Sequence, residues 1–226
     1  MLLKDNLERI RESGIRRINV SMDTLDKSKF KKITGFDGFN DVWEGIIKAH
    51  ALKINPIKIN VVALQGINDD EFIKFAKLTF TYPFHVRFIE HMPLIKTTIS
   101  NGKPLLSDDV KIILSALGEL TPINKGNYDG PAKRYRFKGA KGEIGFISPV
   151  SDHFCKTCNR LRLTASGNIR PCLLSDYQED LKTPLRSGAS DEHLASIIIN
   201  TIEYKPSGHM LSFSEPVSIR MSSIGG

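Results

Sequence analysis

The sequence predicts an α/β fold, in which an open arc of parallel strands and crossover helices precedes a smaller α+β domain. Three segments rich in β-branched residues read as strands, at residues 17–21, 57–64 and 85–89. Helical periodicity fills the intervals between them, and strands that alternate with helices form parallel crossover units. Beyond Pro93 the pattern changes to short strands and turns, which indicates a second domain.

The first hundred residues hold three expected helices. One spans residues 6–13 and ends at Gly14, and another spans residues 39–52. Asn68 is the expected N-cap of the third, with Glu71 at the capping-box position. Three parallel strands are too few to close a barrel, so we expect part of a (β/α) barrel.

The remaining residues predict shorter elements, and the domain boundary is expected near Ser100, which gives domains 1–100 and 101–226. An irregular connection over residues 94–104 precedes a helix capped by Ser107. Expected strands cover residues 134–137, 143–147, 160–164 and 168–172, the last two forming a hairpin about Ser166–Asn168. A short helix is expected to start at Pro184, and a longer one covers residues 191–203.

Composition excludes some classes of protein. The chain has 226 residues and a formal net charge of +7, which permits an anionic partner. No segment approaches the ~20 apolar residues of a membrane span, and the first residues do not resemble a secretory signal. We therefore expect a cytoplasmic protein without a membrane partner. No motif supports binding to nucleic acid.

Cys155, Cys158 and Cys172 are all the cysteines of the chain, and an odd number in a cytoplasmic protein argues against disulfides. Cys155 and Cys158 have the spacing of a metal-binding knuckle. The expected hairpin folds Cys172 back toward them, because neighbouring strands lie about 5 Å apart. A metal site is therefore favoured over three structural thiols.

The spacing leaves two metals open. Zinc prefers four protein ligands, and His153 could complete a Cys3His site in a non-catalytic module. An iron–sulfur cluster with three cysteines keeps one iron open for a ligand. Strand alternation puts Arg160 and Arg162 on one face and the adjacent leucines on the other, where they can pack. Guanidinium groups suit phosphates and guanine edges, so an anionic ligand is expected there.

The segment 144–173, which includes all three cysteines, closely resembles the C-terminal cluster segment of the GTP 3',8-cyclase family. These are radical S-adenosylmethionine (SAM) enzymes of molybdenum cofactor biosynthesis. Segments 18–26, 56–62, 86–93 and 221–226 resemble further stretches of the family in the same order. The implied fold is an incomplete radical SAM barrel followed by an α+β domain with a second iron–sulfur cluster.

The resemblance also implies residue roles. Cys155, Cys158 and Cys172 would hold a [4Fe–4S] cluster whose open iron binds the guanine of GTP. The implied GTP contacts are Lys58, Arg160, Leu161 and Arg162, the implied SAM contacts are Ser21 and Met92, and Gly225 and Gly226 resemble a tail that reaches the active site. From the residues alone, Lys58 fits a barrel interior or a water-facing edge strand equally well.

The implied reaction is radical cyclisation of GTP to (8S)-3',8-cyclo-7,8-dihydroguanosine 5'-triphosphate, with an electron donor as partner and a homodimer left open. The family's N-terminal Cys-x-x-x-Cys-x-x-Cys motif, which holds the SAM-cleaving [4Fe–4S] cluster, is absent from this chain. We therefore expect a fragment that binds GTP but does not cleave SAM. A different radical SAM enzyme with an auxiliary cluster is the remaining alternative.

Overall fold

The computed structural model describes residues 2–92, 104–124, 126 and 130–208. They form two compact units. The first contains the described residues up to His91 and those from 104 to Ser151, and the second contains Met92 and residues 152–208. The sequence-based boundary near residue 100 stays a prediction about family domains, because the first unit takes strands from both sides of it.

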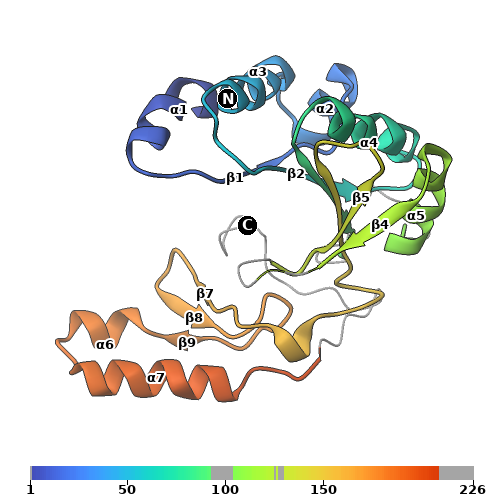
Figure 1. Ribbon diagram of the computed structural model, residues 1–226. Coiled ribbons are helices and arrows are strands. Elements are labelled where there is room, and N and C mark those ends of the chain that lie inside the picture. The colour runs from blue at the N-terminus through green and yellow to red at the C-terminus, as the bar shows by residue number, and fades with distance from the viewer. Residues whose placement is uncertain (1, 93–103, 125, 127–129, 209–226) are drawn as a thin grey trace. The chain divides into compact units, whose positions relative to one another are not determined.

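A six-stranded sheet in the order β1-β2-β3-β6-β5-β4 forms the centre of the first unit (Figure 1). The strands are β1 (Ile18–Ser21), β2 (Ile57–Ala63), β3 (His85–Glu90), β4 (Leu120–Ile123), β5 (Lys133–Phe137) and β6 (Glu143–Ile147). β1, β2 and β3 pair in parallel, which confirms the predicted crossovers. β6 also pairs in parallel with β3, although it was expected as a short strand of the second domain. Among the described residues the sheet stays open, as the expected incomplete barrel requires.

Helices pack on one face of this sheet and build the core (Figure 1). They are α1 (Leu2–Glu12), α2 (Lys27–Thr34), α3 (Phe39–Ala51), α4 (Phe72–Thr81) and α5 (Ser107–Leu114). Alternate residues of β2, such as Ile57, Ile59 and Val61, are fully buried against them. The residues between these are only half-buried, so they face the opposite side of the sheet.

Two elements of the first unit were not predicted, α2 and β4. α2 is rich in lysine and buries only Phe30, so its periodic signal is weak. Its ends are nevertheless well defined, because the Asp26 carboxylate accepts from the backbone N–H of Lys29 at 2.8 Å. Gly35 ends the helix in the left-handed conformation, with φ of 72°.

The predicted capping box at Asn68 and Glu71 is wrong. Asn68 occupies the N-cap position of the 3-10 turn Asp69–Glu71, but its side chain makes no cap hydrogen bond. Its amide instead donates to the carbonyl oxygens of Asp23 at 2.6 Å and Val62 at 2.8 Å. The Glu71 carboxylate accepts from the Thr24 hydroxyl at 2.7 Å. Both side chains are buried, and their hydrogen bonds connect the segment after β1 with the segment after β2.

Glu90, at the end of β3, is a buried anchor for two further segments. Its carboxylate accepts from the backbone N–H groups of Ser107 at 2.9 Å, Val150 at 3.0 Å and Ser151 at 2.9 Å. Burial alone would raise the pKa of Glu90, but these hydrogen bonds lower it below its ordinary value. Ser107 is the first residue of α5 rather than its predicted cap. Its backbone N–H donates to the Glu90 carboxylate.

The second unit combines a small antiparallel sheet with two helices (Figure 1). These elements are β7 (Arg162–Leu163), β8 (Asn168–Arg170), β9 (Glu179–Asp180), α6 (Lys182–Arg186) and α7 (Asp191–Glu203). α7 has its predicted bounds, whereas α6 begins two residues before Pro184 and β9 was not predicted. In the described ranges, no helix combines the length and apolar character that crossing a membrane requires.

Candidate functional site

The cysteine segment begins with a tight turn. Cys155–Thr157 is a single 3-10 turn, and the Cys158 N–H donates to the Cys155 carbonyl at 3.1 Å. Cys172 follows β8, and its sulfur accepts from the Leu174 N–H at 3.4 Å. All three cysteines are free of disulfide bonds and are partly buried.

The predicted hairpin between these cysteines is confirmed, although its strands are shorter than expected. β7 and β8 pair antiparallel, and the Thr164 N–H donates to the Asn168 carbonyl at 2.9 Å. Gly167 has a φ of 91°, which favours glycine, and a Cβ there would lie 2.5 Å from the Lys182 Cβ. Arg170 lies directly opposite Arg162.

The thiols suit a metal chemically but are not gathered around one. Within the described ranges, no group of three or more His, Cys, Asp or Glu side chains lies close enough to hold a metal ion. Three thiols are nevertheless a suitable donor set for an iron–sulfur cluster that keeps one open iron.

Arg162 connects the hairpin to two of the cysteines. Burial and the charge of Arg160 lower the pKa of the Arg162 guanidinium, while Cys172 and Cys158 act in the opposite direction. In the hairpin, Arg162 lies opposite Arg170, two residues before Cys172. The predicted role of Arg160 and Arg162 beside the cysteines stays a prediction.

Arg160 and the leucines depart from the predicted strand pattern. β7 begins only at Arg162, so Arg160 and Leu161 precede the strand, and Leu163 is 64% exposed rather than packed. The Arg160 guanidinium instead lies 5.5 Å from the centre of the Phe154 ring, a cation–π contact. Its backbone carbonyl accepts from the Lys205 ammonium at 2.5 Å.

The sheet face away from the helices is polar. Lys58 is half-buried on β2, directly opposite His85 of β3. Because β2 has a neighbour on each side, Lys58 is not on an edge strand, which removes one of the two alternatives for it. Two residues further along the same face, Asn60 lies opposite Ser21 of β1 and Arg87 of β3.

Asn60 and Arg87 are candidates that the sequence reasoning missed. The Asn60 Oδ1 is buried and has no hydrogen-bond partner among the described residues. Arg87 lies opposite Gly145, where a Cβ would come within 3.0 Å of the Arg87 Cγ, so glycine leaves room for this side chain. Strand alternation from Lys58 would have indicated Asn60, but cross-strand register was needed to find Arg87.

Glu143 balances several cations at the other end of this face. Its buried carboxylate accepts from Arg134 at 2.7 and 2.9 Å and from Arg136 at 2.9 Å, with His85 at 3.4 Å. Burial by itself would raise the pKa of Glu143, but Arg134 and His85 lower it overall. Burial lowers the pKa of His85, which favours the neutral imidazole.

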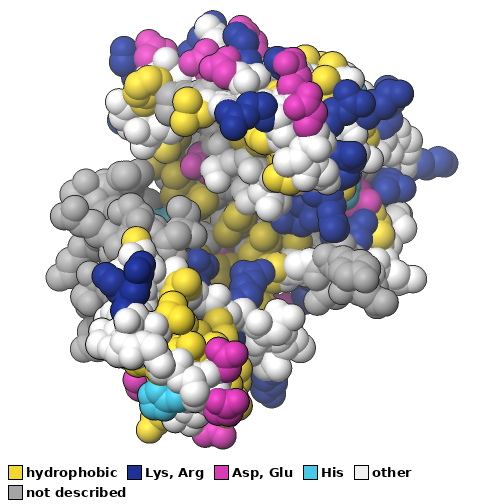
Figure 2. Space-filling view, turned by 90° about the vertical axis from the view of Figure 1, so that its left-hand side faces the viewer, with side chains coloured by type: hydrophobic (Ala, Val, Ile, Leu, Met, Phe, Trp, Pro, Cys, Tyr) yellow, Lys and Arg dark blue, Asp and Glu magenta, His cyan; other side chains and the backbone are white. Residues whose placement is uncertain are grey.

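Charge is mixed elsewhere on the first unit. On the face seen in Figure 2, Lys and Arg side chains are interspersed with Asp and Glu side chains. Exposed ion pairs such as Lys4–Glu44, at 2.5 Å, belong to this pattern. The net charge of +7 is therefore not gathered into one patch on that face.

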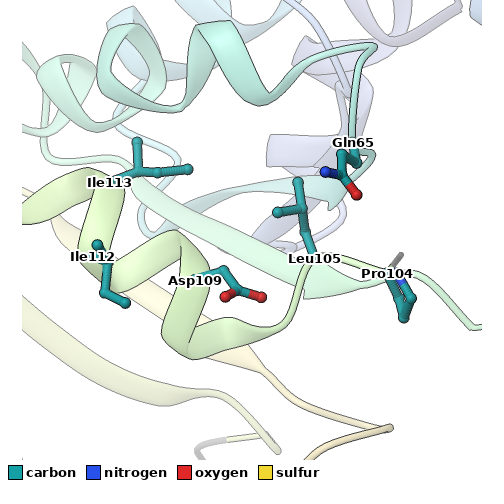
Figure 3. A pocket seen from close by; sticks show the side chains of 6 residues that line it. All are labelled: Gln65, Pro104, Leu105, Asp109, Ile112 and Ile113. Atoms are coloured by element: carbon teal, nitrogen blue, oxygen red, sulfur yellow. The ribbon is translucent and has the colours of Figure 1, made fainter. Parts of the chain in front are cut away.

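A pocket of about 230 Å³ lies beside α5 (Figure 3). Its lining consists of Gln65, Pro104, Leu105, Asp109, Ile112 and Ile113. None of the residues to which the resemblance gives a role lines it. We therefore assign the pocket no part in the reaction.

The predicted SAM contacts and the predicted C-terminal tail stay predictions. Met92 follows β3 and belongs to the second unit, whereas Ser21 belongs to the first. Gly225 and Gly226 lie outside the described residues. Their roles stay predictions.

Comparison with known proteins gives two family matches. The Radical SAM superfamily matches residues 1–79, and Molybdenum Cofactor Synthesis C matches residues 84–211. A GTP 3',8-cyclase of Desulforamulus reducens is 46% identical over 96% of this chain and 67% of its own length. A GTP 3',8-cyclase of Thermodesulfovibrio yellowstonii is 44% identical over 100% of this chain and 70% of its own length. The chain therefore belongs to the GTP 3',8-cyclase family of radical SAM proteins.

Proposed function

We propose that this chain binds GTP for radical cyclisation to (8S)-3',8-cyclo-7,8-dihydroguanosine 5'-triphosphate, the first step of molybdenum cofactor biosynthesis. The observation that carries the proposal is the β7–β8 hairpin, whose register puts Arg162 opposite Arg170, two residues before Cys172. A guanidinium close to cysteine ligands suits an anionic nucleotide held next to a metal. Family membership supports GTP as that nucleotide.

Cys155, Cys158 and Cys172 would hold a [4Fe–4S] cluster. With three protein ligands, the cluster supplies one iron that can take a ligand atom of the substrate, the guanine in this proposal. Arg160 and Arg162 would neutralise the phosphates, and the Phe154 ring restricts the Arg160 guanidinium. Because the thiols are not gathered in the structure, binding of the cluster would draw them together.

The polar sheet face would supply further contacts. Lys58 and Arg87 are cations on this face, and we assign both to GTP. Ser21 lies at the carboxyl end of β1, where ligands of parallel α/β folds bind, and we assign it to SAM together with Met92. The buried Asn60 Oδ1, opposite Ser21, is an acceptor available to the same ligand.

The GTP assignment can be tested by replacing the arginines. After anaerobic reconstitution with iron and sulfide, Arg160→Ala and Arg162→Ala should each weaken GTP binding about tenfold, the loss of one charge-assisted hydrogen bond. Isothermal titration measures the affinity. Arg186→Ala, an exposed arginine on α6, is the control and should bind GTP normally. Unchanged affinity in both variants would refute the assignment.

Metal analysis separates this proposal from its alternatives. A brown protein with iron and sulfide supports the cluster, whereas one equivalent of zinc without iron supports the Cys3His module. A cluster-loaded chain without affinity for GTP would indicate a different radical SAM enzyme. The electron donor, the homodimer and the cytoplasmic location stay predictions.

The chain's capacity to cleave SAM is a separate question, because all three cysteines are assigned to one cluster. The chain spans about two thirds of the length of the curated relatives that it matches. With a strong reductant and SAM, we expect this 226-residue chain to yield no deoxyadenosine. Deoxyadenosine above the level of a protein-free reaction would contradict this expectation.

A further inference from the structure

Arg170, on β8, is a charged side chain with no exposed surface. Its Nη2 donates to the Ser175 carbonyl and lies 3.9 Å from the Asp176 carboxylate. Its Nε and Nη1 atoms are buried and have no hydrogen-bond partner among the described residues. A guanidinium has five N–H donors, so most of this group's capacity is unused.

Such an arrangement is unfavourable in a folded protein. A buried cation has lost its hydration, and only hydrogen bonds and an opposing charge can replace it. Asp176 is 64% exposed, so water screens its attraction for the guanidinium. The described residues therefore offer Arg170 less than a buried cation requires, which points to an additional anion.

The surroundings of Arg170 indicate where the anion binds. Antiparallel register places Arg170 directly opposite Arg162, on the same face of the hairpin. Arg162 is within electrostatic reach of Arg170, Cys172 and Cys158. Cys172 also follows Arg170 by only two residues, so a cluster held by the cysteines would bring negative charge to this region.

We propose that Arg170 is a positioning residue for the iron–sulfur cluster, whose sulfur atoms accept hydrogen bonds from its Nε–H and Nη1–H. The buried cation is then compensated when the cluster is bound. Hydrogen bonds to sulfur and nearby positive charge stabilise the reduced cluster and raise its potential. This inference rests on the proposed assignment of the cluster to Cys155, Cys158 and Cys172.

The test compares apo and reconstituted protein in Arg170→Met, which keeps the length of the side chain but removes its charge. In the apo chain this variant should raise the melting temperature, because an uncompensated buried cation is removed. In the reconstituted chain it should release iron to a chelator about tenfold faster. Its cluster should also have a lower midpoint potential, measured by an EPR-monitored redox titration.

Two further variants serve as controls for the charge of Arg170 and for the loss of any arginine in this unit. Arg170→Lys keeps the charge and should hold the midpoint potential near that of the unmodified chain, even if it releases iron faster. Arg186→Met removes an exposed arginine of the same unit and should change none of these quantities. If Arg170→Met does not fold, the uncharged variant Arg170→Gln replaces it. A midpoint potential that is lowered equally in Arg170→Lys and Arg170→Gln would then overturn the inference.

The outcomes also separate this inference from the proposed function. An unmodified chain that takes up no iron, or does not bind GTP, contradicts the proposed function itself. An unmodified chain that does both, while Arg170→Met keeps its potential and iron release, contradicts only the role of Arg170. An Arg170→Met variant that loses GTP affinity with an unchanged cluster would identify a phosphate as the partner and overturn the inference.

Discussion

The two units treat buried charge differently. In the first, the carboxylates of Glu90 and Glu143 are buried, and the chain itself supplies their donors. In the second, Arg170 is fully buried while two of its nitrogens lack a partner among the described residues. The first unit thus contains the interactions that fix its carboxylates, whereas the cysteine hairpin has capacity that a ligand would use.

In the described part of the first unit, one buried polar atom also lacks a hydrogen-bond partner, and it too lies beside a predicted ligand site. The buried Asn60 Oδ1 lacks a partner in the described part of the chain, and it lies opposite Ser21, the residue assigned to SAM. Unpartnered buried atoms therefore occur beside both predicted ligand sites. Polar groups that serve the framework, such as Asn68 and Glu71, are hydrogen-bonded.

The largest expected loss of stability comes from Glu90. Glu90→Gln should lower the free energy of unfolding by about 3 kcal/mol, because an amide cannot replace a carboxylate that accepts from several N–H groups. Urea unfolding measures it. Glu44→Gln, which disrupts only an exposed ion pair, is the control and should leave the free energy of unfolding almost unchanged. Equal losses would show that Glu90 is not an anchor.

Glu143 should have a somewhat smaller effect. Glu143→Gln leaves Arg134 without its opposing charge and should cost about 2 kcal/mol, less than a fully buried pair because Arg134 is 20% exposed. The same urea experiment applies. A variant as stable as the unmodified chain would indicate that Arg134 and Arg136 find other partners.

Gly167 tests the hairpin in the second unit. Gly167→Ala combines a left-handed φ with a Cβ 2.5 Å from Lys182 and should cost about 2 kcal/mol. Gly188→Ala has a similar φ of 74° but open space around the Cβ, so it should cost about 1 kcal/mol. Thermal unfolding of both variants isolates the steric part. Identical losses would remove the contact with Lys182 as a cause.

The smallest effect is a dependence on pH. The pKa of Glu143 is lower in the folded chain than its ordinary value of 4.5, so its stabilisation is present above pH 4.5 and lost as pH falls through the folded pKa. Burial lowers the pKa of His85 below 6.5, so stability also declines as pH falls below 6.5. Unfolding curves of Glu143→Gln should show a weaker loss below pH 4.5. An unchanged profile would contradict the pairing.

Strong local patterns made part of the fold predictable. β2 is dense in β-branched residues and α7 has clear helical periodicity, so both were found close to their bounds. α2, β4 and β9 are short or mainly polar, and tertiary contacts rather than local propensity form them. Asn68 and Glu71 read as a local cap, but they bond to residues more than forty positions away.

The candidate site divides in the same way. The turn at Gly167 is a local signal, and it predicted the hairpin correctly. Asn60, Arg87 and the burial of Arg170 depend on cross-strand register and packing. Sequence alone does not contain these in a directly readable form.

The most direct test of the account is the affinity for GTP of the same chain in three states: apo, zinc-loaded and reconstituted with iron and sulfide. We predict that the iron-loaded chain binds GTP at least about tenfold more tightly than the other two, because only the cluster offers an open iron beside Arg162. Equal affinity in all three states would contradict the assignment of Cys155, Cys158 and Cys172 to a substrate-binding cluster.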